Sequence, residues 1–291
     1  MGPLDFVNLS PLMARTIGRA EVTIGLIDGP VATDHPGLAG SEILVVKGQY
    51  SGVCSMTSSV ACMHGTFVAG VLLAKRGSAS PAVCPGCTLL VRPIFAEAAS
   101  KTGDMPSATP EELAVAIVET VNAGAHLINL SAAVNGPSAR GEREVEEALS
   151  YAAGKGVIVV AAAGNQGNVG SSAITGHPWV IPVVACDSRG RVMAASNLGS
   201  SIGRHGLSAP GENIASLGPG GGSGKFGGTS AAAPFVTGAI ALLWSEFPAA
   251  SSTSVRVAIT ASGRRKSIVP PLLNAWEAHR ELAQQYGRNL S

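Results

Sequence analysis

A serine stands at a glycine-rich turn that leads directly into a long apolar segment. Residues 226–234 are Phe-Gly-Gly-Thr-Ser-Ala-Ala-Ala-Pro, and an apolar stretch continues to Trp244. This pattern predicts a hydroxyl in the first turn of a buried helix, where unpaired backbone N–H groups favour negative charge. Ser230 is therefore a candidate nucleophile, provided that a base and an orienting carboxylate lie elsewhere in the chain.

A carboxylate and an imidazole in suitable contexts occur earlier in the chain. The apolar run 22–27 ends at Asp28, which Gly-Pro follows, and this predicts a buried strand with a carboxylate at its carboxyl end. His64, followed by Gly-Thr, opens a helical pattern. Asp28, His64 and Ser230 occur in one of the known chain orders of a Ser-His-Asp triad. In such a triad the serine attacks a carbonyl, the histidine moves the proton and the aspartate orients the histidine.

These motifs resemble those of the subtilisin-like serine protease family. Asp28 at a strand end, His64-Gly-Thr and Gly-Thr-Ser230 match the family's catalytic motifs, and residues 161–165, Ala-Ala-Ala-Gly-Asn, are similar to its oxyanion segment. The resemblance implies that Asp28, His64 and Ser230 form a catalytic triad. It also implies that the Asn165 side chain and the Ser230 backbone N–H donate hydrogen bonds to the oxyanion.

The resemblance further indicates where a peptide substrate would bind. The segment 131–133 corresponds to the family segment that pairs with the substrate backbone and forms one wall of the S1 pocket, and residues 161–164 would form the other wall. The family has glycine where this chain has Ala133, which would narrow the pocket. The predicted substrate-binding residues are uncharged and small: Ser131, Ala132, Ala133, Ala161, Ala162, Ala163, Gly164 and Thr229. Nothing in this set indicates a charged residue before the scissile bond.

Strand and helix patterns alternate along the chain. Apolar runs predict buried strands at 22–27, 42–46, 88–92, 126–130, 156–162 and 179–185. Helical patterns occupy about 64–75, 110–124, 141–155, the segment after Ser230, and 271–286. The alternation predicts an α/β fold, a three-layer sandwich with a mostly parallel central sheet, subtilisin-like, with the site at the carboxyl ends of the strands. Irregular loops at 49–63, 97–109 and 218–225 are expected beside the substrate.

The composition excludes several other classes of function. Charged residues make up 13% of the chain, the net charge is +1 and no polybasic run occurs, so nucleic acid and membrane are not expected as partners. No apolar stretch is long enough to span a bilayer. We expect residues 1–291 to form a single peptidase domain without a signal peptide. A prodomain is not expected either, because only 27 residues precede Asp28. A cytoplasmic location follows from these expectations.

The five cysteines leave their pairing open. Cys84-Pro-Gly-Cys87 is a CxxC, a pattern typical of redox or metal pairs, and Cys54 and Cys62 are the nearest additional ligands for zinc. The alternatives are buried or loop thiols, or a disulfide within the segment 54–87. Cys186 follows an apolar run and is expected in the core. No acidic loop has calcium-ligand spacing, so we predict no metal site and no cofactor, although structural calcium is common in the family.

A narrower resemblance points to the protease domains of cyanobactin biosynthesis, which process ribosomally made precursor peptides. Asp28 is followed by Gly-Pro and then by Asp34-His35-Pro36, and the segments 90–95 and 123–129 are similar as well. In that family one activity cleaves a leader by hydrolysis and another closes a ring. Macrocyclising members carry a helical insertion between the aspartate and the histidine. Here only 36 positions separate Asp28 from His64, so we predict hydrolysis.

Two further functions are compatible with the motifs. One is a general degradative subtilase, and the other is an inactive binding module with a subtilisin fold. The complete set of Asp28, His64, Asn165 and Ser230 favours an enzyme over the binding module.

Overall fold

A seven-stranded parallel sheet forms the centre of the protein in the computed structural model, which describes residues 2–98, 107–131, 139–261 and 267–287. The strands are β1 (Thr23–Asp28), β2 (Glu42–Val45), β3 (Thr88–Pro93), β4 (Leu127–Leu130), β5 (Ile158–Ala162), β6 (Val180–Cys186) and β7 (Leu207–Pro210). Their order across the sheet is β2-β3-β1-β4-β5-β6-β7. The six strands predicted from apolar runs are thereby confirmed, and β7 is an addition.

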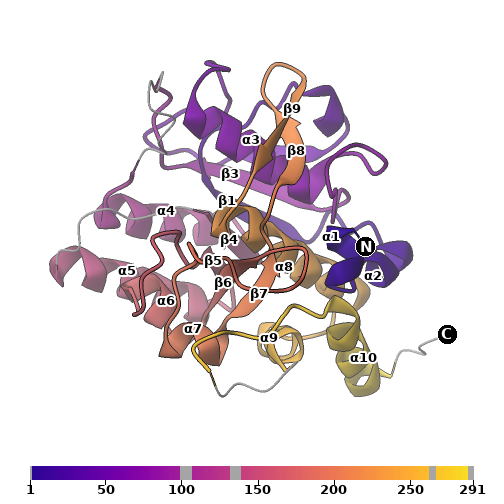
Figure 1. Ribbon diagram of the computed structural model, residues 1–291. Coiled ribbons are helices and arrows are strands. Elements are labelled where there is room, and N and C mark those ends of the chain that lie inside the picture. Colours follow the sequence, from indigo (N-terminus) through magenta and orange to yellow (C-terminus); the bar gives the residue numbers. More distant parts are fainter. Residues whose placement is uncertain (1, 99–106, 132–138, 262–266, 288–291) are drawn as a thin grey trace.

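Helices cover both faces of this sheet and produce the predicted three-layer sandwich (Figure 1). The longer helices are α3 (Val60–Leu73), α4 (Pro110–Asn122), α5 (Ala139–Gly154), α8 (Thr229–Glu246) and α10 (Ala275–Tyr286). The short ones are α1 (Pro3–Phe6), α2 (Leu9–Arg15), η1 (Pro36–Leu38), α6 (Ala173–Gly176), α7 (Ser200–His205) and α9 (Ser252–Thr260). The five short α-helices were missed, because four to nine residues show too little periodicity to identify a helix.

Alternate side chains of β1 enter two different cores. Ile24 and Leu26 pack into the core that contains α3 and α8, whereas Ile27 packs into the core beneath α4 and α5. A parallel strand that is buried on both faces is apolar along most of its length. The polar residue Asp28 therefore appears only where the strand leaves the core, at its carboxyl end. Because β4 and β5 run parallel to β1, their carboxyl ends lie at the same edge of the sheet as Asp28.

The glycine-rich segment predicted as an irregular loop at 218–225 is instead largely an antiparallel hairpin. Strands β8 (Ile214–Gly218) and β9 (Gly222–Phe226) pair from Ile214 opposite Phe226 to Gly218 opposite Gly222. Gly220 and Gly221, with φ of 73° and 80°, form the tight turn, a backbone conformation that glycine adopts without a steric penalty. Glycines within the strands conceal the period-two pattern in the sequence. The hairpin packs against α3 and projects beside it (Figure 1).

One disulfide joins Cys54 to Cys62 and links the loop before α3 to the first turn of that helix. Cys84 and Cys87 are free and buried, and the described residues place neither of them beside Cys54 and Cys62 in a potential metal site. Cys186 is fully buried in β6, as expected. The described residues bring one further potential ligand, a Glu97 carboxylate oxygen, near the Cys54 and Cys62 sulfurs. Metal ligation requires thiolates, which the disulfide removes.

Reduction of this disulfide should lower the free energy of unfolding by about 2–3 kcal/mol, because the cross-link restricts the unfolded chain. Denaturant unfolding with and without dithiothreitol measures the difference. The double variant Cys54→Ala/Cys62→Ala is the control and should not respond to the reductant. An unchanged unfolding midpoint in the reduced wild-type protein would contradict the expectation.

Candidate active site

The end of β1 and the first half of α3 bring Asp28 and His64 together. Asp28 is fully buried, and its Oδ1 accepts hydrogen bonds from His64 Nδ1 at 2.7 Å and from the backbone N–H of Gly29 at 2.6 Å. Its other oxygen, Oδ2, is buried without a hydrogen-bond partner among the described residues. Since a carboxylate only accepts, the proton of His64 lies on Nδ1 and Nε2 is left to act as a base.

A close backbone approach determines how His64 faces Asp28. A Cβ on Gly29 would lie 2.0 Å from the carbonyl oxygen of Ala61, and a Cβ on Gly65 would lie 2.4 Å from the carbonyl oxygen of Gly29. Only glycine at both positions lets the first half of α3 lie against the chain that leaves β1. Gly65 adjoins His64 and Gly29 adjoins Asp28, so this contact sets the distance between imidazole and carboxylate.

His64 is held in a largely enclosed environment, with 4% of its surface exposed. The ring of Phe226 packs edge-on against the imidazole, with centroids 5.8 Å apart. Burial opposes charging of the imidazole, but the charge of Asp28 and its hydrogen bond outweigh that effect and raise the pKa of His64 above 6.5. The pair thus favours the imidazolium that would form when His64 accepts a proton.

This raised pKa predicts the pH dependence of activity. His64 accepts the serine proton only when it is neutral, so kcat/KM should fall as the pH drops through the raised pKa. The acid limb of the profile should therefore lie above the ordinary histidine value of 6.5. A pH profile of kcat/KM measures this limb, and a midpoint below that value would contradict the prediction.

Ser230 is the second residue of α8, and the chain enters this helix through a glycine. Gly228 has φ of 92°, and a Cβ on it would lie 2.7 Å from Asn165 Oδ1. Because Ser230 lies in the first turn, its backbone N–H has no acceptor within the helix and can donate to a bound group. The Ser230 Oγ donates to the carbonyl oxygen of Ser131 at 3.2 Å, and no hydrogen bond joins it to His64 in the described chain. To be activated, the hydroxyl must turn from Ser131 to His64.

The side chain of Asn165 is oriented by Thr229. Asn165 Oδ1 accepts from the Thr229 backbone N–H at 2.9 Å and from its Oγ1 at 3.2 Å. The Gly164 N–H donates to the same Thr229 hydroxyl at 3.2 Å. Because a backbone N–H can only donate, Oδ1 must face Thr229, and the Nδ2 group points away from it. Asn165 therefore offers an N–H donor beside the first turn of α8, as an oxyanion would require.

Thr229 itself was expected to contact substrate. Its side chain is fully buried, and its backbone N–H and hydroxyl orient the amide of Asn165. Ala161 and Ala163 are also buried, each within a hydrophobic cluster. Ala162 and Gly164 are partly exposed and can face a substrate.

The predicted opposite wall begins at Ser131, which directly follows β4. Its carbonyl is the acceptor for Ser230 and is suited to receive a substrate N–H. Ala132 and Ala133 lie outside the described residues, and so does the part of the predicted substrate loop at 99–106.

Two buried or half-buried amides in this region were missed by the sequence analysis. Asn129 in β4 donates to Ser131 Oγ at 2.8 Å and accepts from Thr237 Oγ1 at 2.8 Å, which ties the pocket wall to α8. The sequence feature that could have identified Asn129 is that it is a lone amide within the apolar run 126–130. Asn197 bonds the loop that carries Asn165, and its sequence signal was only a polar turn.

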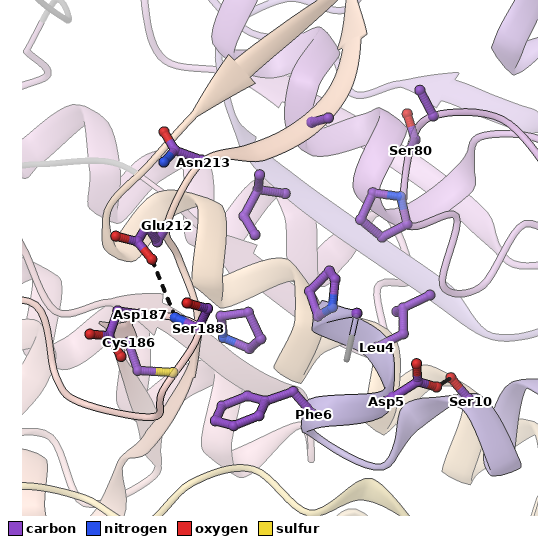
Figure 2. A pocket seen from close by; sticks show the side chains of 17 residues that line it. Leu4, Asp5, Phe6, Ser10, Ser80, Cys186, Asp187, Ser188, Glu212 and Asn213 are labelled. Carbon is purple, nitrogen blue, oxygen red and sulfur yellow. Dashed lines mark hydrogen bonds between the residues drawn. The ribbon is translucent and has the colours of Figure 1, made fainter.

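Two features outside the triad are a surface cavity and the buried residue His35. A cavity of about 480 Å³ lies between α1, the segment 79–81 and the start of β8, and Figure 2 shows its lining, with Phe6 and Glu212 among the labelled side chains. No triad residue lines it. His35, which pairs with Asp34 in the sequence, is structural: its Nδ1 accepts from Gly37 N–H and its Nε2 hydrogen-bonds the Gly222 carbonyl.

Comparisons with known proteins place this chain among subtilases. Residues 19–276 match the model of the subtilase family. Subtilisin amylosacchariticus from Bacillus subtilis subsp. amylosacchariticus is 32% identical over 244 residues, 81% of this chain and 59% of the relative. Among solved structures, the protease domain of PatA is 30% identical with a TM-score of 0.80, over 94% of this chain and 98% of that one. The prenylagaramide maturation protease PagA is 27% identical with a TM-score of 0.81, over the same shares.

The chain spans about three fifths of the length of that subtilisin. Within the described ranges, none of the helices combines the length and the apolar character that a bilayer crossing requires.

Proposed function

Because this chain belongs to the subtilase family of serine peptidases, we propose that it is an endopeptidase that cleaves the leader from a ribosomally made precursor peptide. The observation that carries this proposal is its likeness, across 94% of its length, to the protease domain of PatA and to PagA, a prenylagaramide maturation protease. The substrate is accordingly a peptide, bound between Ser131 on one side and residues 162–164 on the other.

In the proposed mechanism, Ser230 Oγ turns from the Ser131 carbonyl and attacks the scissile carbonyl carbon while His64 Nε2 takes its proton. A backbone N–H of the substrate then donates a hydrogen bond to the Ser131 carbonyl, which no longer accepts from the Ser230 hydroxyl. Asn165 Nδ2 and the Ser230 N–H stabilise the oxyanion. His64 then protonates the leaving amine, and an ester joins the substrate acyl group to Ser230. Water, deprotonated by His64, attacks this ester and releases the acid and the free serine.

Hydrolysis is favoured over ring closure by the chain between Asp28 and His64. All residues of this segment are described, and before α3 it contains only η1 and β2, with no α-helical insertion. An insertion that shields the acyl-enzyme from water is the feature expected of a macrocyclising member. Without such an insertion, we expect water to reach the ester on Ser230.

Product masses after incubation with a precursor peptide test this proposal. Hydrolysis gives a linear leader and a linear core, whereas a core lighter by one water would show ring closure and contradict the proposal. Casein is the comparison substrate, and its extensive digestion would favour a general degradative protease. A chain that neither cleaves peptides nor reacts with a fluorophosphonate, but still binds a partner, would be a binding module.

A cytoplasmic location stays a prediction of the sequence. Ribosomal synthesis of the proposed substrate supports it, whereas the Cys54–Cys62 disulfide is a bond that reducing compartments seldom maintain. Thiol alkylation of the protein in intact cells, followed by mass analysis of the peptides that contain Cys54 and Cys62, distinguishes the two conditions.

A further inference from the structure

The loop that presents Asn165 needs support from outside itself. Residues 163–168 follow β5 but belong to no helix or strand. A catalytic donor must nevertheless be held within a fraction of an ångström, because a displacement of about 1 Å can cost about 100-fold in rate. Thr229 fixes the amide oxygen of Asn165 from one side. The segment 195–198 holds the backbone of the loop from the other.

The side chain of Asn197 bonds the loop directly after Asn165. Its Oδ1 accepts from the backbone N–H of Gln166 at 3.1 Å and from that of Asn168 at 3.0 Å. Its Nδ2 donates to Gln166 Oε1 at 2.8 Å. On the other side of Asn165, the Asn197 backbone N–H donates to the Gly164 carbonyl at 2.9 Å. One residue thus restrains the chain on both sides of the catalytic amide.

The support is itself anchored to the central sheet. The Gly167 N–H donates to the Ala195 carbonyl at 2.8 Å, and the Leu198 N–H donates to the Asn168 carbonyl at 2.9 Å. The buried hydroxyl of Ser196 accepts from the Ala185 N–H in β6 at 3.1 Å. These hydrogen bonds therefore fix the position of the loop relative to strand β6.

We infer that Asn197 is a positioning residue for the oxyanion donor Asn165. It acts through its Oδ1, which accepts from the Gln166 and Asn168 N–H groups and so determines where the Asn165 amide lies. The described residues provide no other acceptor for these two N–H groups. The inference rests on the proposed oxyanion role of Asn165 but not on the identity of the precursor substrate.

A double-mutant cycle tests this inference with p-nitrophenyl acetate. This small ester acylates the serine without requiring a precursor peptide. The acylation rate constant is measured for wild type, Asn165→Ala, Asn197→Ala and the double variant. Asn165→Ala should lower it about 10²–10³-fold, and Asn197→Ala about 10–100-fold. The double variant should be no slower than Asn165→Ala, because contacting residues that act as one unit are not additive.

Two controls separate positioning from general stability. Asn197→Asp retains an oxygen acceptor for the two N–H groups and should recover part of the rate. Asn122→Ala, at an exposed asparagine that accepts from Tyr151 at the end of α4, should retain the wild-type rate. An unchanged rate in Asn197→Ala, or an equal fractional loss with and without Asn165, would overturn the inference. Failure to cleave a precursor while this cycle behaves as expected would count only against the proposed substrate.

Discussion

Replacing Ser230 with alanine should reduce kcat about 10⁶-fold, the size of effect known for removal of the serine in a subtilisin triad. The reason is that the Ser230 hydroxyl is the proposed nucleophile, and an alanine side chain cannot form the acyl-enzyme. The fold should persist, because within the described residues the Ser230 hydroxyl makes a single hydrogen bond, to the Ser131 carbonyl. The hydrolysis that is left would come from substrate binding and the oxyanion donors.

Fluorophosphonate labelling and peptide hydrolysis measure this loss together. Ser230→Ala should neither label nor turn over, while its unfolding midpoint stays close to that of the wild type. Ser188→Ala is the matched control, because Ser188 is exposed and lies in the cavity of Figure 2, away from the triad. Retention of labelling by Ser230→Ala would mean that another residue is the nucleophile.

Replacing Asp28 with asparagine should lower kcat about 10⁴-fold, the loss expected when the carboxylate of a triad becomes an amide. The shape of the side chain is almost unchanged, but the negative charge beside His64 Nδ1 is lost. Burial then disfavours the imidazolium without opposition, so the pKa of His64 should fall below its wild-type value. The transition state, in which His64 carries the serine proton, is destabilised accordingly.

Titration of His64 by NMR and the measurement of kcat examine both parts of this expectation in the same variant. Asp34→Asn is the control, since Asp34 is exposed in the nearby loop and should behave as wild type. A His64 pKa that is unchanged in Asp28→Asn would show that the carboxylate does not control the imidazole. A normal kcat would remove Asp28 from the mechanism.

Much of the fold could be predicted because strands of a doubly covered parallel sheet are apolar along their length. This holds for β1, whose run ends at Asp28, and for β5, whose run ends before Asn165. The β8–β9 hairpin could not be predicted, because its glycines weaken the local pattern and its register depends on packing against α3. The pairing of Cys54 with Cys62 likewise depends on which loop reaches the first turn of α3.

The sequence alone identified the candidate reacting groups of this protein. Asp28, His64, Asn165 and Ser230 lie in short motifs whose chemistry is local, so they could be recognised without knowing their neighbours. The tertiary structure decided how these groups are held. That Thr229 orients Asn165, that Asn197 supports its loop, and that Ser230 donates to Ser131 are contacts between distant parts of the chain. Such contacts depend on the packing of strands and helices, and no local spacing specifies them.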